Sequence, residues 1–123
     1  MPTRGIRGAT TVNADTKNEV LEATIEMLKE IAAANLGFKS EDIASAFFTV
    51  TGDINSTFPA LAARQMGWNL VPMVCAREIP VPGSLSLCIR VLIHWNTDLT
   101  QEKIKHIYLR RAKALRPDLV EEK

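Results

Sequence analysis

The run from Cys88 to Ile93 constrains this chain most, because it places an arginine in the middle of the most apolar, strand-like segment. The alternation around it predicts a strand over 87–95, with Arg90, Leu92 and His94 on one face. An arginine does not lose its proton in a protein, so a buried or cleft arginine needs a negatively charged partner. We therefore expect an anion at Arg90, supplied by the protein or by a ligand.

The composition is that of one globular domain. A chain of 123 residues buries roughly two-thirds of its unfolded surface, which is enough for a core without disulfide support. The net charge of +1 argues against a nucleic-acid or anionic-lipid partner, and no run approaches the ~20 apolar residues that span a bilayer. The first residues, MPTRGIRG, lack the apolar core of a secretion signal. We expect a cytoplasmic protein with neither a nucleic-acid nor a membrane partner.

Motifs for metals, cofactors and disulfides are missing from the sequence. Cys75 and Cys88 are too few for a disulfide framework, and His94 and His106 do not have the spacing of metal ligands. There is also no glycine-rich phosphate loop. We expect no metal and no cofactor.

The order of the predicted elements indicates an α+β fold in a single domain over 1–123. The order is β-α-β-α-β-β followed by short C-terminal elements. The predicted strands cover 4–12, 43–51, 71–76 and 87–95, the long helix 16–36 and the short helix 57–67. A helical turn at 101–105, a brief strand at 106–109 and a turn at 110–115 precede a mobile tail at 117–123. One long and one short helix packed on a mixed sheet leave one face bare, which predicts oligomerisation.

Three local patterns refine this picture. Thr16 and Glu19 have capping-box spacing at the start of the long helix, and Gly37 follows its predicted end. In the first strand, Gly5 and Gly8 allow a close backbone approach. The apolar stripe of the long helix is predicted to be Leu21, Ile25, Leu28 and Ala32.

Several arginines qualify as donors for a carboxylate ligand. Arg7 is flanked on its face of the strand by Gly5 and Ala9, although an exposed edge arginine fits the same spacing. Arg64 lies on the face of Ala60 in the short helix, where a solvated arginine is also an ordinary finding. Other possible members of an anion site are Arg90, Arg116 and Tyr108.

The remaining candidates are an acid and a thiol. Glu78 is the one acid among these groups, and it is suited to accept a hydrogen bond from a ligand hydroxyl. Cys75 has no evident histidine partner, so a thiolate nucleophile is disfavoured. Cys75 and Glu78 point to opposite faces of a regular strand, so both line one site only if the strand ends or bulges between them. Donors without a nucleophile suit a reaction that needs positioning and charge stabilisation.

At this point the chain resembles a known family, the Bacillus-type monofunctional chorismate mutases, over nearly its whole length. The matching blocks are RGIRGATTV at 4–12, FPA at 58–60 with Arg64, VP at 71–72 with Cys75 and Glu78, CIRV at 88–91, TD at 97–98, HIYL at 106–109 and LRPDL at 115–119. Each block is weak alone, and the ordered set is specific.

The resemblance implies a fold, an assembly and a reaction. It implies a homotrimer whose sheets pack into a pseudo-α/β barrel, with active sites in clefts between neighbouring subunits. It also implies the pericyclic Claisen rearrangement of chorismate to prephenate, in the biosynthesis of phenylalanine and tyrosine. The reaction requires neither a cofactor nor a covalent intermediate.

The resemblance also implies roles for individual residues. Arg90 would contact the ether oxygen of the breaking bond, where negative charge grows in the transition state. Arg7 and Tyr108 would hold carboxylates, and Glu78 and Cys75 the ring hydroxyl. The pocket lining would be Val74, Cys75, Ala76, Arg77 and Glu78, the neighbouring subunit would contribute Phe58, Ala60 and Arg64, and a closing C-terminal segment would contribute Leu115 and Arg116.

Two positions depart from the family pattern. Leu61 stands where family members carry a lysine, and Val74 stands where they can carry a threonine. Neither departure touches Arg7, Glu78 or Arg90. Two other functions remain open: a homologue that binds chorismate or another anion without turnover, and a small trimeric imine or enamine deaminase that also uses an arginine for a carboxylate.

Overall fold

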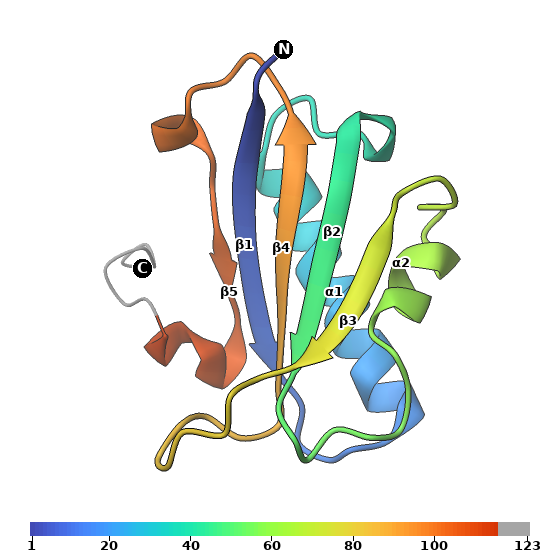
Figure 1. The fold of residues 1–123 in the computed structure, drawn as a ribbon, viewed down its shortest axis with the longest axis vertical. Helices are drawn as coiled ribbons and strands as arrows, with labels where there is room; N and C mark the ends of the chain where they lie inside the picture. The colour runs from blue at the N-terminus through green and yellow to red at the C-terminus, as the bar shows by residue number, and fades with distance from the viewer. Residues whose placement is uncertain (116–123) are drawn as a thin grey trace.

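A five-stranded mixed sheet organises residues 1–115, the part of the chain that this computed structural model describes. At its centre β1 (Thr3–Thr11) runs antiparallel to β4 (Cys88–Asn96), and β4 is antiparallel to β2 (Ile43–Val50) on its other side. At the edges β3 (Met73–Arg77) is parallel to β2, and β5 (Ile107–Tyr108) is parallel to β1. The strand order β3-β2-β4-β1-β5 (Figure 1) confirms the predicted mixed sheet.

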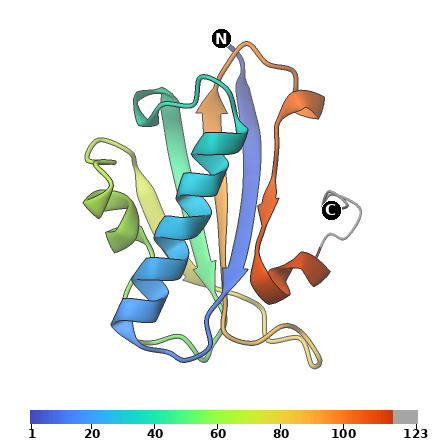
Figure 2. The ribbon, with the colours of Figure 1, turned by 180° about the vertical axis from the view of Figure 1, so that it is seen from behind.

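Both α-helices lie on the same face of the sheet. α1 (Lys17–Ala34) crosses behind the central strands, and α2 (Ala60–Gln65) lies beside it near β3 (Figure 2). The opposite face, which is in front in Figure 1, is covered by neither helix. This face, called the bare face below, agrees with the small number of helices predicted from the sequence.

The start of α1 confirms one half of the predicted capping box. Thr16 is the N-cap, and its hydroxyl accepts a hydrogen bond from the backbone N–H of Glu19 at 3.1 Å. The Glu19 carboxylate instead accepts from the backbone N–H of Asn13 at 3.2 Å. Glu19 therefore ties the incoming loop to the helix, and the reciprocal bond to Thr16 is replaced.

The buried stripe of α1 differs from the prediction in its angle around the helix. Leu21 and Leu28 are buried as expected, but Ile25 is half-buried and Ala32 is exposed. The remaining buried positions are Val20, Ala23, Thr24, Met27 and Ile31. The stripe is centred nearer to Met27 because Met27 and Ile31 pack closely over Gly8 of β1, a tertiary contact that apolar spacing alone does not reveal.

Gly8 permits the close packing of α1 on β1. A Cβ atom placed on Gly8 would lie 2.8 Å from Ile31 Cδ1 and 3.0 Å from Val91 Cγ1. The same atom on Gly5 would meet only Leu92 Cδ1, at an ordinary 3.7 Å. The predicted close approach is therefore real at Gly8, on the helix-covered face, and is not needed at Gly5.

The remaining elements follow the prediction with shifted ends. α2 is shorter than 57–67, with Pro59 at its N-cap. Short 3₁₀ helices at Gln101–Lys103 and Arg110–Ala114 flank β5. No helix formed by residues 1–115 combines the length and apolar character that a membrane crossing needs. The predicted tail at 117–123 lies outside the described residues, as does Arg116.

Candidate active site

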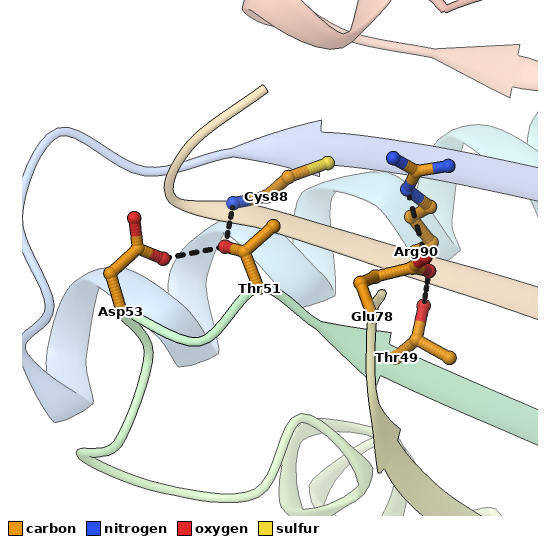
Figure 3. A network of polar contacts seen from close by, with 6 residues as sticks. All are labelled: Thr49, Thr51, Asp53, Glu78, Cys88 and Arg90. Atoms are coloured by element: carbon orange, nitrogen blue, oxygen red, sulfur yellow. Dashed lines mark hydrogen bonds and ion pairs between the residues drawn. The ribbon is translucent and has the colours of Figure 1, made fainter. Parts of the chain in front are cut away.

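Arg90 lies on the bare face, near the start of the central strand β4. The register places it opposite Ala9 of β1 and opposite Thr49 of β2, so it projects from the central strand. Its side chain is 23% exposed, and its Nε lies 3.5 Å from Oε2 of Glu78. Figure 3 shows that both terminal nitrogens point away from Glu78. Because the Nε contact is long, Arg90 keeps donor capacity for a second anion.

Glu78 reaches Arg90 from the end of β3. Its backbone N–H still donates to Val50 O at 2.9 Å, which continues the pairing with β2 one residue beyond the strand. Its carboxylate accepts a hydrogen bond from the hydroxyl of Thr49 through Oε2, the same oxygen that faces Arg90 (Figure 3). No prediction from the sequence included Thr49, since a threonine in a β-strand is unremarkable.

Arg7 contributes a second cation to the bare face. It pairs with Leu92 in the β1–β4 register, and Leu92 is two residues from Arg90 on the same face. Its backbone N–H donates to Nδ1 of His106 at 2.9 Å, which holds the strand beside the C-terminal segment. Within the described residues, the half-buried guanidinium of Arg7 has no hydrogen bond or ion pair. It is therefore available to an anion.

Tyr108 stands at the β5 side of these arginines. It is 5% exposed, lies next to Ala9 in the parallel pairing of β1 with β5, and packs with Ala9 and Ala112. Leu115 is a half-buried neighbour of this small cluster. No atom among residues 1–115 hydrogen-bonds the buried hydroxyl of Tyr108. A buried polar group without a partner costs free energy, so this hydroxyl is suited to meet a ligand.

The side chains of β3 divide between the two faces. Val74 and Ala76 pair with Phe47 and Thr49, so they lie on the bare face near Glu78. Cys75 pairs with Phe48 and packs against the core on the helix-covered face. The structure thus does not bring the Cys75 thiol to Arg90, because β3 stays regular through that position.

Arg77 is engaged elsewhere. Its Nη1 donates to Ile54 O at 2.7 Å and to Thr51 O at 3.1 Å, and its Nη2 donates to the side chain of Asn55 at 2.5 Å. These bonds fasten the loop after β2. The side chain therefore departs from its predicted place in the pocket lining, because backbone carbonyls occupy its donors.

The predicted residues around α2 lie away from Arg90 within one chain. Phe58 precedes the helix and is 70% exposed, Ala60 is buried in its first turn, and Arg64 is exposed near its end. α2 belongs to the helix-covered face (Figure 2). If these residues belong to the same site as Arg90, a second copy of the chain must supply them.

A polar network fixes the loop that leads into β4. The carboxylate of Asp53 accepts hydrogen bonds from the backbone N–H of Leu87 at 3.0 Å and from the Thr51 hydroxyl at 2.5 Å. The hydroxyl oxygen of Thr51 in turn accepts from the backbone N–H of Cys88 at 2.9 Å (Figure 3). Leu87 has a φ of 48°, a left-handed conformation that is strained for leucine, and the bond to Asp53 holds it there. Beside Glu78, residues 51–53, 79–81 and 84–86 border a depression of about 200 Å³. Burial raises the pKa of the Cys88 thiol, which disfavours the thiolate.

The arrangement can bind a small anion with two carboxylates. Arg7, Arg90 and Tyr108 supply donors, and Glu78 supplies one acceptor. No group of three or more His, Cys, Asp or Glu within residues 1–115 is placed to hold a metal ion. Fixed donors of this kind act on charge that develops during a reaction.

Comparisons with known proteins agree on one family. A family model described as chorismate mutase type I matches residues 3–119. The chain is 55% identical to chorismate mutase AroH of Thermus thermophilus over 117 residues, 94% of this chain and 95% of the relative. It is 44% identical to chorismate mutase AroH of Bacillus subtilis over 120 residues, 97% of this chain and 94% of the relative. Its fold is similar to a solved chorismate mutase from Clostridium thermocellum, with a TM-score of 0.87, 51% identity and coverage of 89% and 97% of the two chains.

Proposed function

The chain belongs to the chorismate mutase type I family and is an isomerase that acts on chorismate; from this premise we propose that the rearrangement takes place over the bare face, at Arg90. The observation that carries this proposal is the set of unsatisfied donors on that face. Arg90 has a long contact with Glu78 and lies beside the buried Cys88 thiol, and within residues 1–115 the Arg7 guanidinium and the Tyr108 hydroxyl have no partner. A dianionic substrate would satisfy all three.

Arg90 is the group that distinguishes the transition state from the substrate. As the C–O bond of chorismate breaks, negative charge grows on the ether oxygen. A fixed guanidinium there binds the transition state more tightly than the ground state, an effect worth roughly 3–4 kcal/mol for one well-placed donor. The strand and the Glu78 contact hold Arg90 before substrate arrives, so little reorganisation is needed.

Arg7 and Tyr108 restrain the substrate. Carboxylates of chorismate meet the guanidinium of Arg7 and the hydroxyl of Tyr108, beside which Leu115 packs. Holding both ends of the molecule selects the compact conformer in which the reacting carbons are close, and this lowers the entropic part of the barrier. No covalent intermediate is required.

Glu78 and the main chain of Cys75 bind the ring hydroxyl. Glu78 Oε1 is the carboxylate oxygen without a contact to Arg90 or Thr49. Because β3 pairs only with β2 and Glu78 N–H faces β2, the N–H and C=O of Cys75 face the open edge of the sheet. Cys75 therefore contributes through its backbone, and Val74, Ala76 and Arg77 shape the strand that presents it.

We also propose that a second copy completes the site in a homotrimer. The bare face exposes 42% of Phe47 and 54% of Val74, and the loop before α2 exposes 70% of Phe58. Burying such apolar surface stabilises an assembly, and it would bring Phe58, Ala60 and Arg64 of a neighbour over Arg90. Two free thiols, Cys75 and Cys88, suit a reducing, cytoplasmic location.

The activity test follows the loss of chorismate absorbance with the native protein, Arg90→Ala and Arg90→Lys. We expect turnover by the native protein, none above background by Arg90→Ala, and bound substrate with little turnover for Arg90→Lys, because an ammonium does not reproduce the planar fork. Arg4→Lys is the matched control, since Arg4 Nε donates to Leu99 O away from the site. Near-native kcat in Arg90→Lys would overturn the role of Arg90.

Sedimentation equilibrium tests the assembly. We expect a mass of three chains at micromolar concentration. A fully active monomer would rule out a site shared between copies.

A further inference from the structure

The hydroxyl of Thr49 is the only side-chain hydrogen-bond partner of Glu78 in the described residues. It donates to Oε2, the oxygen that also faces Nε of Arg90 at 3.5 Å. Thr49 lies opposite Arg90 in the β2–β4 register and opposite Ala76 in the β2–β3 register, so its strand runs between the two that carry Arg90 and Glu78. The Glu78 carboxylate reaches across and lies between the Thr49 hydroxyl and Arg90 (Figure 3). Glu78 is the first residue after β3, which ends at Arg77, so no further strand pairing follows it.

This hydroxyl determines which part of Arg90 the carboxylate touches. A free carboxylate beside a guanidinium prefers the bidentate contact, with two parallel N–H···O bonds. Here Glu78 instead contacts Nε, and the terminal nitrogens point away from it. The hydrogen bond from Thr49 to Oε2 keeps the Glu78 carboxylate beside Nε and away from the terminal nitrogens of Arg90.

We propose that Thr49 is a positioning residue that keeps Glu78 from covering the anion-binding side of Arg90. The inference rests on the proposed roles of Arg90 and Glu78. Without the hydroxyl, Glu78 moves onto the terminal nitrogens and becomes an internal competitor for the anionic substrate. With it, Arg90 stays open, and Oε1 of Glu78 stays directed toward the substrate hydroxyl.

The consequence is a specific kinetic signature. An internal competitor is displaced by saturating substrate, so it raises KM and changes kcat little. We expect Thr49→Val, which keeps the shape and loses the hydroxyl, to raise KM about tenfold, the lower end for a hydrogen bond to a charged group. Thr49→Ser, which keeps the hydroxyl, should restore most of the native KM. A purely structural role would instead reduce the amount of active enzyme, which lowers apparent kcat at unchanged KM.

Two further variants make the test specific. In a Glu78→Ala background, Thr49→Val should have no additional effect, because the two residues act through one contact. Ser45→Ala is the matched control, since Ser45 lies on the same face of β2 but its hydroxyl contacts His94 at 3.0 Å. Where turnover is too slow for kinetics, the affinity for prephenate measured by calorimetry replaces KM. Thr49→Ala serves in the same comparison if Thr49→Val does not fold.

The outcomes separate this inference from the proposed function. An unchanged KM in Thr49→Val, or an equal KM increase in the Glu78→Ala background, overturns the role of Thr49. If Arg90→Ala is inactive at the same time, the site at Arg90 stands and only the positioning role is lost. If Arg90→Ala is fully active, the proposed site itself fails, whatever Thr49 does.

Discussion

Replacing Gly8 by alanine tests how closely α1 must approach the sheet. The added Cβ would lie 2.8 Å from Ile31 Cδ1, 3.0 Å from Val91 Cγ1 and 3.3 Å from Met27 Cγ. The ends of Ile31 and Met27 can rotate, but Val91 is β-branched and belongs to the central strand, so it moves little. Overpacking of this kind lowers the free energy of unfolding by about 1–3 kcal/mol. Alanine also reduces the conformational entropy of the unfolded chain relative to glycine, which offsets about 0.4–1 kcal/mol of this loss.

We therefore expect Gly8→Ala to lower the stability by about 1–2 kcal/mol, which corresponds to a decrease in Tm of roughly 4–8 °C for a domain of this size. Differential scanning calorimetry at one protein concentration measures this, since the Tm of an oligomer depends on concentration. Gly52→Ala is the control, because nothing lies within 4 Å of its Cβ position. Equal Tm values for the two variants would refute the packing argument. Because Gly8 lies between Arg7 and Ala9, a shifted strand should also raise KM.

The remaining predictions concern a carboxylate and the two thiols. The hydroxyl of Ser56 and the backbone N–H groups of Asn55 and Ser56 lower the pKa of Asp15 below its ordinary 3.8. Because the pKa of Asp15 is lower in the folded protein than in the unfolded chain, its ionised carboxylate stabilises the fold at any pH above the unfolded pKa. This contribution is lost as the pH falls through the folded pKa. The Tm difference between the native protein and Asp15→Asn should therefore be complete near neutral pH and shrink below pH 3.8. A Tm difference that stays constant in melting scans across this pH range would contradict the role of Asp15. Cys75→Ser should remain active, because the thiol packs against the core. A folded but inactive variant would point back to thiolate chemistry. Cys88 is buried with a raised thiol pKa, so mass spectrometry should find it alkylated only after unfolding, and rapid labelling of the native protein would disagree.

The sequence predicts the strands well because their alternation is a local property. β2 and β4 begin and end within a residue of the prediction, and the alternating burial of β4 places Arg90 on the half-exposed face, as expected. Helix faces were less predictable. The position of Gly8 decides where α1 can approach the sheet, and that contact joins segments far apart in the chain. Apolar spacing predicts that Ile25 and Ala32 are buried, but tertiary packing leaves Ile25 half-buried and Ala32 exposed.

The side-chain partners in the site were the least predictable part. Alternation along a strand predicts that Cys75 and Glu78 point to opposite faces, and the structure agrees, with Cys75 on the core side. The bond from Thr49 to Glu78 joins two strands, and nothing in either local sequence signals it. The bonds of Arg77 to the loop after β2 were missed for the same reason.

The folded structure shows which arginine side chains are already hydrogen-bonded within the chain, and the sequence alone does not. Arginines at four described positions use their guanidinium groups on backbone carbonyls of the same chain: Arg4, Arg77, Arg110 and Arg111. These bonds fasten loops and strand ends, so these four guanidinium groups have a structural role. Arg7 and Arg64 have no such bond among the described residues, and Arg90 has a long contact with Glu78 beside the Cys88 thiol. Since a guanidinium stays charged at every relevant pH, half-buried Arg7 and Arg90 leave an excess of positive charge on the bare face that one carboxylate, Glu78, does not neutralise. A ligand carboxylate offsets that excess, so substrate binding also neutralises this positive charge.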